Sequence, residues 1–164
     1  MEIIKATKDN DIKKIAALAQ EIWTEHFTPI LGKDQVEYMI FKFQSYEAIS
    51  RYIKENNYSY YYLTFADKYF GYIGLQIQGN NLFLSKLYIK KEYRSKGYGR
   101  LALEFLDTYA LKYNLKSIYL TVNKNNLNSI AAYLKCGYIK TKEEKADIGY
   151  GFFMDDYIMT KKIP

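Results

Sequence analysis

The chain has 164 residues, of which 49% are hydrophobic, and this is enough for one compact domain with an apolar core. Lys and Arg number 24 against 18 Asp and Glu, so the net charge is +6, which suits an anionic partner of any kind. One cysteine and one histidine exclude a disulfide framework and a Cys/His metal cluster, and we expect no metal. Without a membrane helix or signal peptide in the pattern, we expect a soluble protein of a reducing cytosol.

The chain is expected to open with a short strand and a helical region. The strand is "EIIKA", and the amphipathic helix after it is capped by Asp9 or Asn10 and ends at Trp23. Pro29 and Gly32 then break the chain before two more helical stretches, "KDQVEYMIFKFQ" and "YEAISRYIKEN".

The middle of the chain changes to the period of a strand. We expect "YSYYYLTF" and "YFGYIGLQIQ" to form a hairpin joined at residues 66–68, and "LFLSKLYIK" to follow a turn at residues 79–81. Helices in "LEFLDTYALKY" and "NSIAAYLKC", the second ended by Gly137, alternate with the strands "KSIYLTV", "YIKTKEEK" and "GFFMDDYIMTK". The order predicts one domain over residues 1–164, with a mixed sheet and helices on both sides.

The stretch "RSKGYGR", residues 94–100, places two glycines and three cations directly before a helix. A helix start offers N–H groups without partners and a partial positive charge, and glycine lets a ligand approach the backbone. Together these features predict a phosphate site. The spacing is neither that of a Walker loop nor that of a dinucleotide fold, and Gly-x-Gly alone is equally typical of a solvated basic loop.

Two motifs together resemble the GNAT N-acetyltransferase superfamily. In "LYIKKEYRSKGYGRLAL", Arg94, Gly97 and Gly99 fit its motif A, Arg/Gln-x-x-Gly-x-Gly/Ala. "LTVNKNNLNSIAAYLKCGY" is similar to its motif B, and the matching residues are Asn126, Ser129, Tyr133, Gly137 and Tyr138. The resemblance covers most of the chain. It implies the GNAT fold, an α/β (α+β) fold with a central mixed, mostly antiparallel, twisted sheet of six to seven strands and helices on both faces.

The resemblance implies an N-acetyltransferase that uses acetyl-CoA, with the pyrophosphate on the motif A loop and the pantetheine arm along the strand before it. The residues it assigns to acetyl-CoA are Leu87, Tyr88, Ile89, Arg94, Ser95, Lys96, Gly97, Tyr98, Gly99, Arg100, Asn126, Tyr133 and Lys135. The thioester would lie where this strand splays from the parallel strand at residues 118–122. The N–H of Leu87 or Ile89 would polarise its carbonyl, and Tyr133 would be the catalytic hydrogen-bond donor beside the sulfur.

The acceptor amine must lose a proton before it attacks, because an alkylamine with a pKa of ~10.4 is almost wholly charged at pH 7. Several relatives carry a glutamate for this purpose on the motif A strand, where this chain has Ser85. Glu21 and Glu25 are candidates that would act through water, and a backbone carbonyl is the alternative acceptor of the proton. The base is left unassigned.

The residues expected at the acceptor site are Glu21, Trp23, Glu25, Tyr38 and Ser85. Asp155 and Asp156 in the final strand would add carboxylates to the groove. The runs "EIWTEHFTPILGKDQVEYM" and "IGYGFFMDDYIM" resemble the PaiA-like branch of the superfamily, which acetylates polyamines. The resemblance therefore implies spermidine or spermine as acceptor. The competing interpretation is that the aromatic rings pack the core and that the carboxylates are solvated surface.

Other functions stay open. The acceptor is alternatively a protein N-terminus of the ribosomal-protein type. A nucleic-acid-binding module would use the basic face at residues 90–100, but it lacks a recognised motif. An acyl-CoA sensor without turnover is disfavoured by an intact Tyr133. We expect a small-molecule amine partner, no nucleic acid and no membrane, and a homodimer is left open.

Overall fold

The computed structural model describes residues 1–164, and its internal contacts divide them into two compact units. The first unit consists of Met1–Gln76 and Lys86–Ala102, and the second of Ile77–Ser85 and Leu103–Pro164. Seven strands are hydrogen-bonded in the order β1-β2-β3-β4-β5-β7-β6. The β4–β5 pair is parallel, whereas β1–β2, β2–β3, β5–β7 and β6–β7 are antiparallel. The predicted fold class, a mixed and mostly antiparallel sheet, is confirmed.

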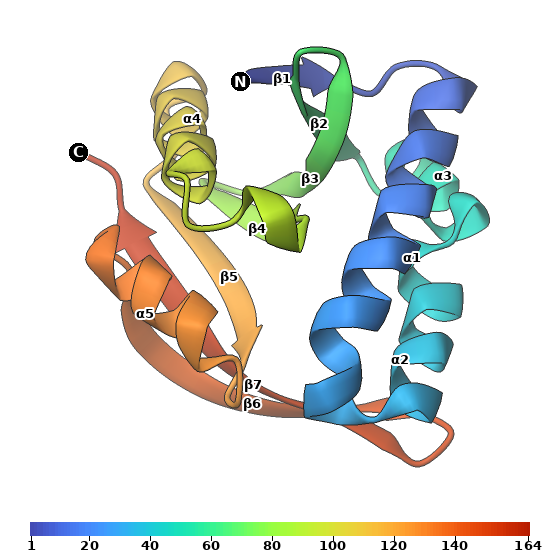
Figure 1. Cartoon of the computed structure of the whole chain (residues 1–164). Helices are drawn as coiled ribbons and strands as arrows, with labels where there is room; N and C mark the ends of the chain where they lie inside the picture. The colour runs from blue at the N-terminus through green and yellow to red at the C-terminus, as the bar shows by residue number, and fades with distance from the viewer. The chain divides into compact units, whose positions relative to one another are not determined.

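The first unit contains the helical region and the first strands of the sheet. Its elements are β1 (Glu2–Lys5), α1 (Asp9–Leu31), α2 (Lys33–Met39), the π-helical turn η1 (Ile40–Gln44), α3 (Tyr46–Glu55), β2 (Tyr58–Phe65), most of β3 (Lys68–Gln78), the end of β4 (Asn81–Ile89), the 3-10 turn η2 (Lys91–Tyr93) and the start of α4 (Tyr98–Lys112). Figure 1 shows α1 running beside α2 and α3. None of the helices in the structure has the combination of length and apolar character that a membrane crossing requires.

α1 is longer than the sequence pattern predicted, because it continues past Trp23 and through Pro29 to Leu31. Trp23 and Phe27 are both buried, so the apolar face of the helix extends by one more turn and favours its continuation. Pro29 lies in the last turn, where the loss of one backbone donor removes little of the hydrogen-bond ladder.

The start of α1 also differs from the prediction, since Asp9 and Asn10 are the first helical residues and not its cap. The carboxylate of Asp11 accepts hydrogen bonds from the backbone N–H groups of Thr7 and Lys8 at 3.1 and 3.0 Å. Asp11, inside the first turn, therefore accepts hydrogen bonds from two backbone N–H groups just before the helix.

The hairpin predicted between the two tyrosine-rich stretches is confirmed. Ala66 and Asp67 have φ angles of 48° and 59°, as the two-residue turns that fit the twist of paired strands require. β2 pairs with β3 from Tyr58 opposite Gln76 to Phe65 opposite Lys68.

The second unit contains the remaining strands and two helices. Besides the first half of β4 and most of α4, it holds β5 (Ser117–Asn123), α5 (Leu127–Lys135), β6 (Ile139–Gly149) and β7 (Phe152–Lys162). Figure 1 shows α5 lying along the β6–β7 hairpin. The core is formed by side chains such as Leu106 of α4, Ile118 and Leu120 of β5 and Met159 of β7, all of which are buried.

One ion pair identifies the sheet face that α4 covers within the second unit. Lys161 of β7 donates to Asp107 Oδ2 of α4 at 2.6 Å. Lys161 lies opposite Ile118 of β5, and paired residues of antiparallel strands share a face. Because side chains alternate along a strand, Ile118, Leu120 and Val122 face α4, and Asn123 faces the other way.

Candidate active site

The predicted phosphate loop lies in the first unit, between the end of β4 and α4. α4 begins at Tyr98, so Gly99 is already in the first helical turn. Ser95 and Gly97 have φ angles of 59° and 84°, which turn the chain sharply into the helix. The first backbone hydrogen bond into the helix runs from Leu101 N to Gly97 O at 3.1 Å. The N–H groups of residues 95–99 make no hydrogen bond in the protein and form an open row of donors.

Neither glycine of the loop is needed to avoid a clash within the protein. A Cβ at Gly97 would meet nothing within 4 Å, and a Cβ at Gly99 would lie 3.8 Å from Ile89 Cδ1, an ordinary contact. The positive φ of Gly97 explains its identity, whereas Gly99 needs neither special backbone angles nor internal space. The predicted reason for Gly99 is the approach of a ligand to the backbone, since a helix start with free amides is suited to phosphate oxygens.

The charges of the loop have different surroundings. Arg94 is half-buried, its Nε donates to Ile89 O at 2.7 Å, and one terminal nitrogen lies 3.3 Å from His26 Nδ1. Arg94 therefore fastens the loop to the end of β4, a role that the sequence analysis did not predict. Lys96 and Arg100 are exposed. Their side chains are the ones that provide charge at the surface of the loop.

Aromatic rings support β4 from the side of α1. The ring of Tyr88 lies 5.2 Å from Trp23, 5.5 Å from Tyr72 and 5.9 Å from Phe27. Trp23 is only 4% exposed, and its Nε1 donates to the Tyr72 hydroxyl at 3.0 Å. Trp23, which was predicted to line the acceptor site, packs in the core beside the strand, and its place in the acceptor site stays a prediction.

Sequence reasoning missed Gly71, which lets β3 come close to the end of β4. A Cβ at this position would lie 2.6 Å from the carbonyl oxygen of Tyr88, a distance that real side chains do not reach. The signal was present, because a glycine inside an apolar strand often marks a close backbone approach. Gly71 thus fixes the course of the chain just before the loop.

The glutamates predicted for the acceptor site are paired with lysines at the end of β4. Glu21 Oε2 lies 2.7 Å from Lys90 Nζ, and Glu25 Oε1 lies 3.9 Å from Lys91 Nζ. The hydroxyl of Tyr38 accepts a hydrogen bond from Lys42 at 3.0 Å. Neither glutamate is therefore placed to offer an unengaged negative charge.

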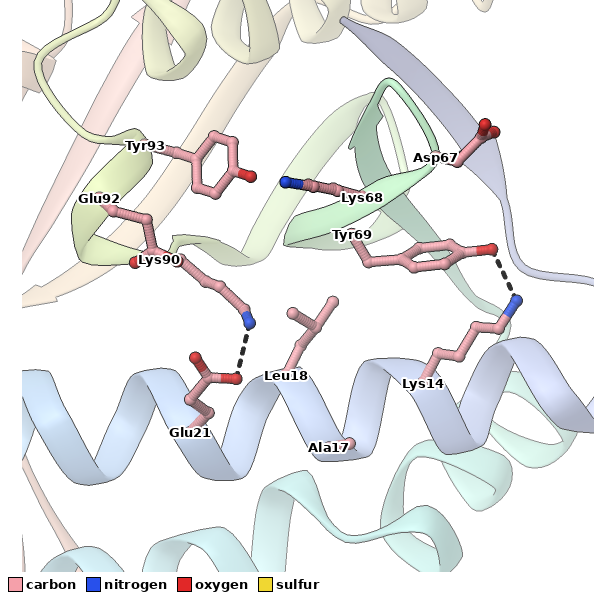
Figure 2. A pocket seen from close by; sticks show the side chains of 10 residues that line it. All are labelled: Lys14, Ala17, Leu18, Glu21, Asp67, Lys68, Tyr69, Lys90, Glu92 and Tyr93. Atoms are coloured by element: carbon pink, nitrogen blue, oxygen red, sulfur yellow. Dashed lines mark hydrogen bonds and ion pairs between the residues drawn. The ribbon is translucent and has the colours of Figure 1, made fainter.

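A pocket of about 530 Å³ opens beside α1 in the first unit (Figure 2). It is lined by Lys14, Ala17, Leu18, Glu21, Asp67, Lys68, Tyr69, Lys90, Glu92 and Tyr93. Three lysines face three carboxylates, and the Glu21–Lys90 pair lies on its wall. The pocket includes one residue of the predicted acceptor set and none of residues 94–100. Its balanced charges are not what attracts a polycation.

The motif B residues lie at α5 in the second unit. Asn126 is buried just before the helix, and its N–H donates to Asn123 O at 2.9 Å. The half-buried ring of Tyr133 lies 5.6 Å from the ring of Tyr138. Burial, with a smaller effect from Cys136, raises the pKa of Tyr133 to about 12, so its hydroxyl keeps its proton at any working pH. Lys135 is exposed in the last turn.

The parallel ladder between β4 and β5 is short. It joins Asn81–Leu84 to Ser117–Leu120. Residues 121–123 of β5 continue beyond this ladder and pair only with β7. Ser85, the position where relatives carry a glutamate, is half-buried just after the paired part of β4.

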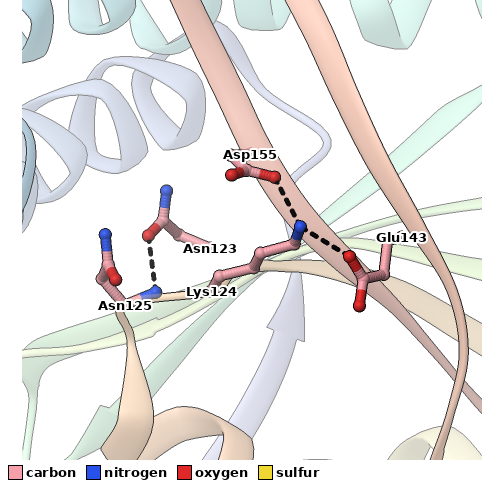
Figure 3. A network of polar contacts seen from close by, with 5 residues as sticks. All are labelled: Asn123, Lys124, Asn125, Glu143 and Asp155. Atoms are coloured by element: carbon pink, nitrogen blue, oxygen red, sulfur yellow. Dashed lines mark hydrogen bonds and ion pairs between the residues drawn. The ribbon is translucent and has the colours of Figure 1, made fainter.

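A lysine joins three strands at the end of β5 (Figure 3). Lys124 Nζ lies 2.8 Å from both Asp155 Oδ1 and Glu143 Oε2, and the hydrogen bonds to these two carboxylates raise the pKa of Lys124. Next to it, Asn123 Oδ1 accepts from Asn125 N at 2.9 Å. Asp155, expected among the acceptor carboxylates, is thus neutralised by an ion pair.

Asp156 has no such partner. Its side chain is 8% exposed, and its Oδ1 is buried without a hydrogen bond. It lies opposite Asn123 of β5 on one side and Glu144 of β6 on the other. Burial, together with the negative charges of Asp155 and Glu144, raises the pKa of Asp156 to about 6.

The chain is similar to a known protein family, to a related protein and to solved structures. The profile of the acetyltransferase (GNAT) family matches residues 15–138. A spermidine N(1)-acetyltransferase of Thermoplasma acidophilum is 28% identical over 163 residues, which are 97% of this chain and 96% of that protein. The crystal structure of the PaiA N-acetyltransferase of the same organism, in complex with coenzyme A, superposes with a TM-score of 0.79 at 24% identity over 99% of both chains. The ribosomal-protein-S18-alanine N-acetyltransferase of Escherichia coli reaches a TM-score of 0.74 at 18% identity, over 99% of this chain and 93% of that one.

Proposed function

Since the chain belongs to the acetyltransferase (GNAT) family, we propose that it transfers the acetyl group of acetyl-CoA to a polyamine such as spermidine or spermine. The observation that carries the acetyl-CoA part is the open row of amides at residues 95–99, set at a helix start in a chain of this family.

The residues around this row fit the cofactor. The amides would bind the pyrophosphate, with charge from Lys96 and Arg100, which are both exposed beside the loop. The main chain of Leu87 and Ile89 would hold the arm and polarise the acyl carbonyl through an N–H group. The predicted set also includes Asn126, just before α5, and Lys135 in its last turn, both in the second unit. Acetyl-CoA would supply an acyl carbon already activated as a thioester.

Tyr133 would act as a hydrogen-bond donor to the leaving sulfur. Its pKa of about 12 lies well above that of an ordinary thiol at ~8.5, so complete transfer of its proton costs roughly 5 kcal/mol. A donated hydrogen bond avoids most of this cost. Tyr133 would therefore release its proton only as another proton returns to its oxygen.

The polyamine part rests on the relative that is 28% identical and bears the name spermidine N(1)-acetyltransferase. The net charge of +6 does not favour a cationic acceptor over long distances, so recognition would have to come from local carboxylates. In the first unit the glutamates predicted for this purpose are paired with lysines. In the second unit, the buried Asp156 and its exposed neighbour Glu144 remain.

A competition assay tests the acceptor. Acetyl-CoA is offered with spermidine, spermine, an alanyl peptide and an aminoglycoside in one mixture, at two salt concentrations, and the products are identified by mass spectrometry. We expect the polyamines to react fastest and their rates to fall with salt, as screened attraction requires. A preference for the peptide, with inert polyamines, would move the function to protein acetylation.

A further inference from the structure

We propose that Asp156 is the proton acceptor that activates the amine, an inference that rests on the acetyl transfer proposed above. Asp156 lies on β7 opposite Asn123, in the part of β5 that is no longer paired with β4. In the proposed function the thioester would lie beside this part of β5, and the carboxylate would then be near the reacting nitrogen.

Asp156 and Tyr133 belong to opposite sides of the sheet in the second unit. A Cβ at Gly137, just after α5, would lie 3.6 Å from Lys161 Cε, and Lys161 is the residue that bonds to α4. Tyr133 on α5 therefore belongs to the α4 side. Asp156 shares the orientation of Asn123, which faces away from α4. An acid and a base on opposite sides keep the proton taken from the nitrogen separate from the proton given to the sulfur.

Two neighbouring carboxylates of the second unit are engaged, because Asp155 and Glu143 both pair with Lys124 at 2.8 Å. Glu144, opposite Asp156 on β6, is exposed to solvent. Asp156 instead keeps Oδ1 buried and unpartnered. A buried charge without a partner costs stability, and such a cost is typical of a group kept for chemistry.

The surroundings of Asp156 adjust its basicity. The groups that act on it are Asp155 on its own strand, Glu144 on β6 and Lys124 just after β5, while its direct neighbour on β5 is the neutral Asn123. Desolvation and the two carboxylates outweigh the lysine, and the pKa rises to about 6. Asp156 is thus ionised at neutral pH and is a stronger base than an ordinary aspartate.

The step balances with this assignment. The carboxylate of Asp156 takes one proton from the ammonium group of the acceptor, and the nitrogen lone pair forms the C–N bond at the acyl carbon. The C–S bond breaks, and the sulfur receives a proton from the Tyr133 hydroxyl. The second nitrogen proton is lost as the amide forms and restores Tyr133 through solvent. Asp156 then releases its proton to water, so one amine, one thioester and no further reactant are consumed.

The test is the pH dependence of kcat/KM for spermidine in the full chain. We expect the wild-type rate to fall below a pH near 6, and Asp156→Asn to lose this acid limb together with about a hundredfold or more in kcat. Asp155→Asn removes a charge that raises the pKa of Asp156, so the limb should move to lower pH. Glu143→Gln, a carboxylate of the Lys124 network, is the matched control and should keep both the rate and the limb.

The outcomes separate this inference from the proposed function. A wild type that acetylates no amine contradicts the proposed function itself. A wild type that acetylates spermidine beside an Asp156→Asn variant of equal kcat and equal pH profile overturns the role of Asp156 alone. A higher KM with an unchanged limb would also overturn it, since Asp156 would then only hold the cation. If Asp156→Asn does not fold, Asp155→Asn still tests the proposal. An acid side of the pH profile at the same pH in wild type and in Asp155→Asn would contradict it.

Discussion

Burial raises the pKa values of both Tyr133 and Asp156 in the second unit, but to very different levels. It raises the pKa of Tyr133 to about 12 and, with two neighbouring carboxylates, that of Asp156 to about 6. Between these values Tyr133 is a neutral donor and Asp156 a charged acceptor. Two titratable groups with separated pKa values are how one site assigns an acid and a base.

Tyr133→Phe should lower kcat by roughly tenfold or more while acetyl-CoA still raises the melting temperature as in the wild type. The change removes only the hydroxyl, so the packing against Tyr138 stays. Tyr138→Phe is the control, because the buried Tyr138 hydroxyl has no hydrogen-bond partner and its loss should leave kcat unaltered. Equal kcat in wild type and Tyr133→Phe would remove Tyr133 from the reaction.

Asp156→Asn should stabilise the fold at neutral pH. The pKa of Asp156 is raised from an ordinary ~3.9 to about 6 in the folded state, so its favourable contribution is complete below pH 4 and is lost as the pH rises through 6. The loss is worth roughly 3 kcal/mol, and the uncharged amide avoids it. The free energy of urea unfolding at pH 5 and pH 8 measures this effect. A variant less stable than wild type at pH 8 would contradict an unpaired buried charge.

At the scale of elements, the two glycines at the start of α4 have different roles, one in folding and one in the proposed binding. Gly97 has a φ of 84°, which side chains adopt only with strain, while Gly99 is helical and meets only an ordinary contact. The two glycines of the motif therefore serve different physical requirements in this chain.

Gly99→Ala should leave the fold as stable as wild type and weaken acetyl-CoA binding about tenfold or more, because the methyl group would cover the amides that the phosphates approach. Gly97→Ala should instead cost about 1–2 kcal/mol of stability from its backbone angle. Calorimetric binding and urea unfolding of both variants distinguish the effects. If Gly99→Ala binds acetyl-CoA with wild-type affinity, the turn is not the phosphate site.

Much of the fold could be predicted because local patterns agree with it. The tyrosine-rich stretches alternate as strands, and the motif loop precedes a helix as expected. The end of α1 could not be predicted, since the burial of Phe27 that extends the helix depends on tertiary packing. The same holds for the glutamates: nothing local shows that Glu21 would meet Lys90, distant in sequence.

The candidate site shows the same division. Residues 95–99 form the predicted row of amides because a helix start has this property wherever it occurs. The contacts that bury Trp23 against Tyr72 and Tyr88 join residues far apart in sequence, so no local pattern could show them. Asp155 and Asp156 are adjacent on β7, so their side chains lie on opposite faces of the sheet. Which of the two faces which side depends on the strand register, which the sequence does not show.

At the scale of the molecule, the net charge of +6 should attract the anionic phosphates of acetyl-CoA, and salt should screen this attraction. We expect the Kd of acetyl-CoA to rise when salt is raised from about 0.05 to 0.5 M. Acetylated pantetheine, which lacks the phosphates, is the matched control and should show little change. Salt-independent binding of acetyl-CoA would argue against a phosphate site at this basic loop.

Hydrogen–deuterium exchange of the amides at residues 95–99 tests the central claim most directly. In the free protein these N–H groups have no hydrogen-bond partner and should exchange rapidly. With saturating acetyl-CoA we expect this segment to become strongly protected, while acetylated pantetheine leaves it exchanging. Protection elsewhere in the chain, with residues 95–99 still exchanging at the rate of the free protein, would contradict the account.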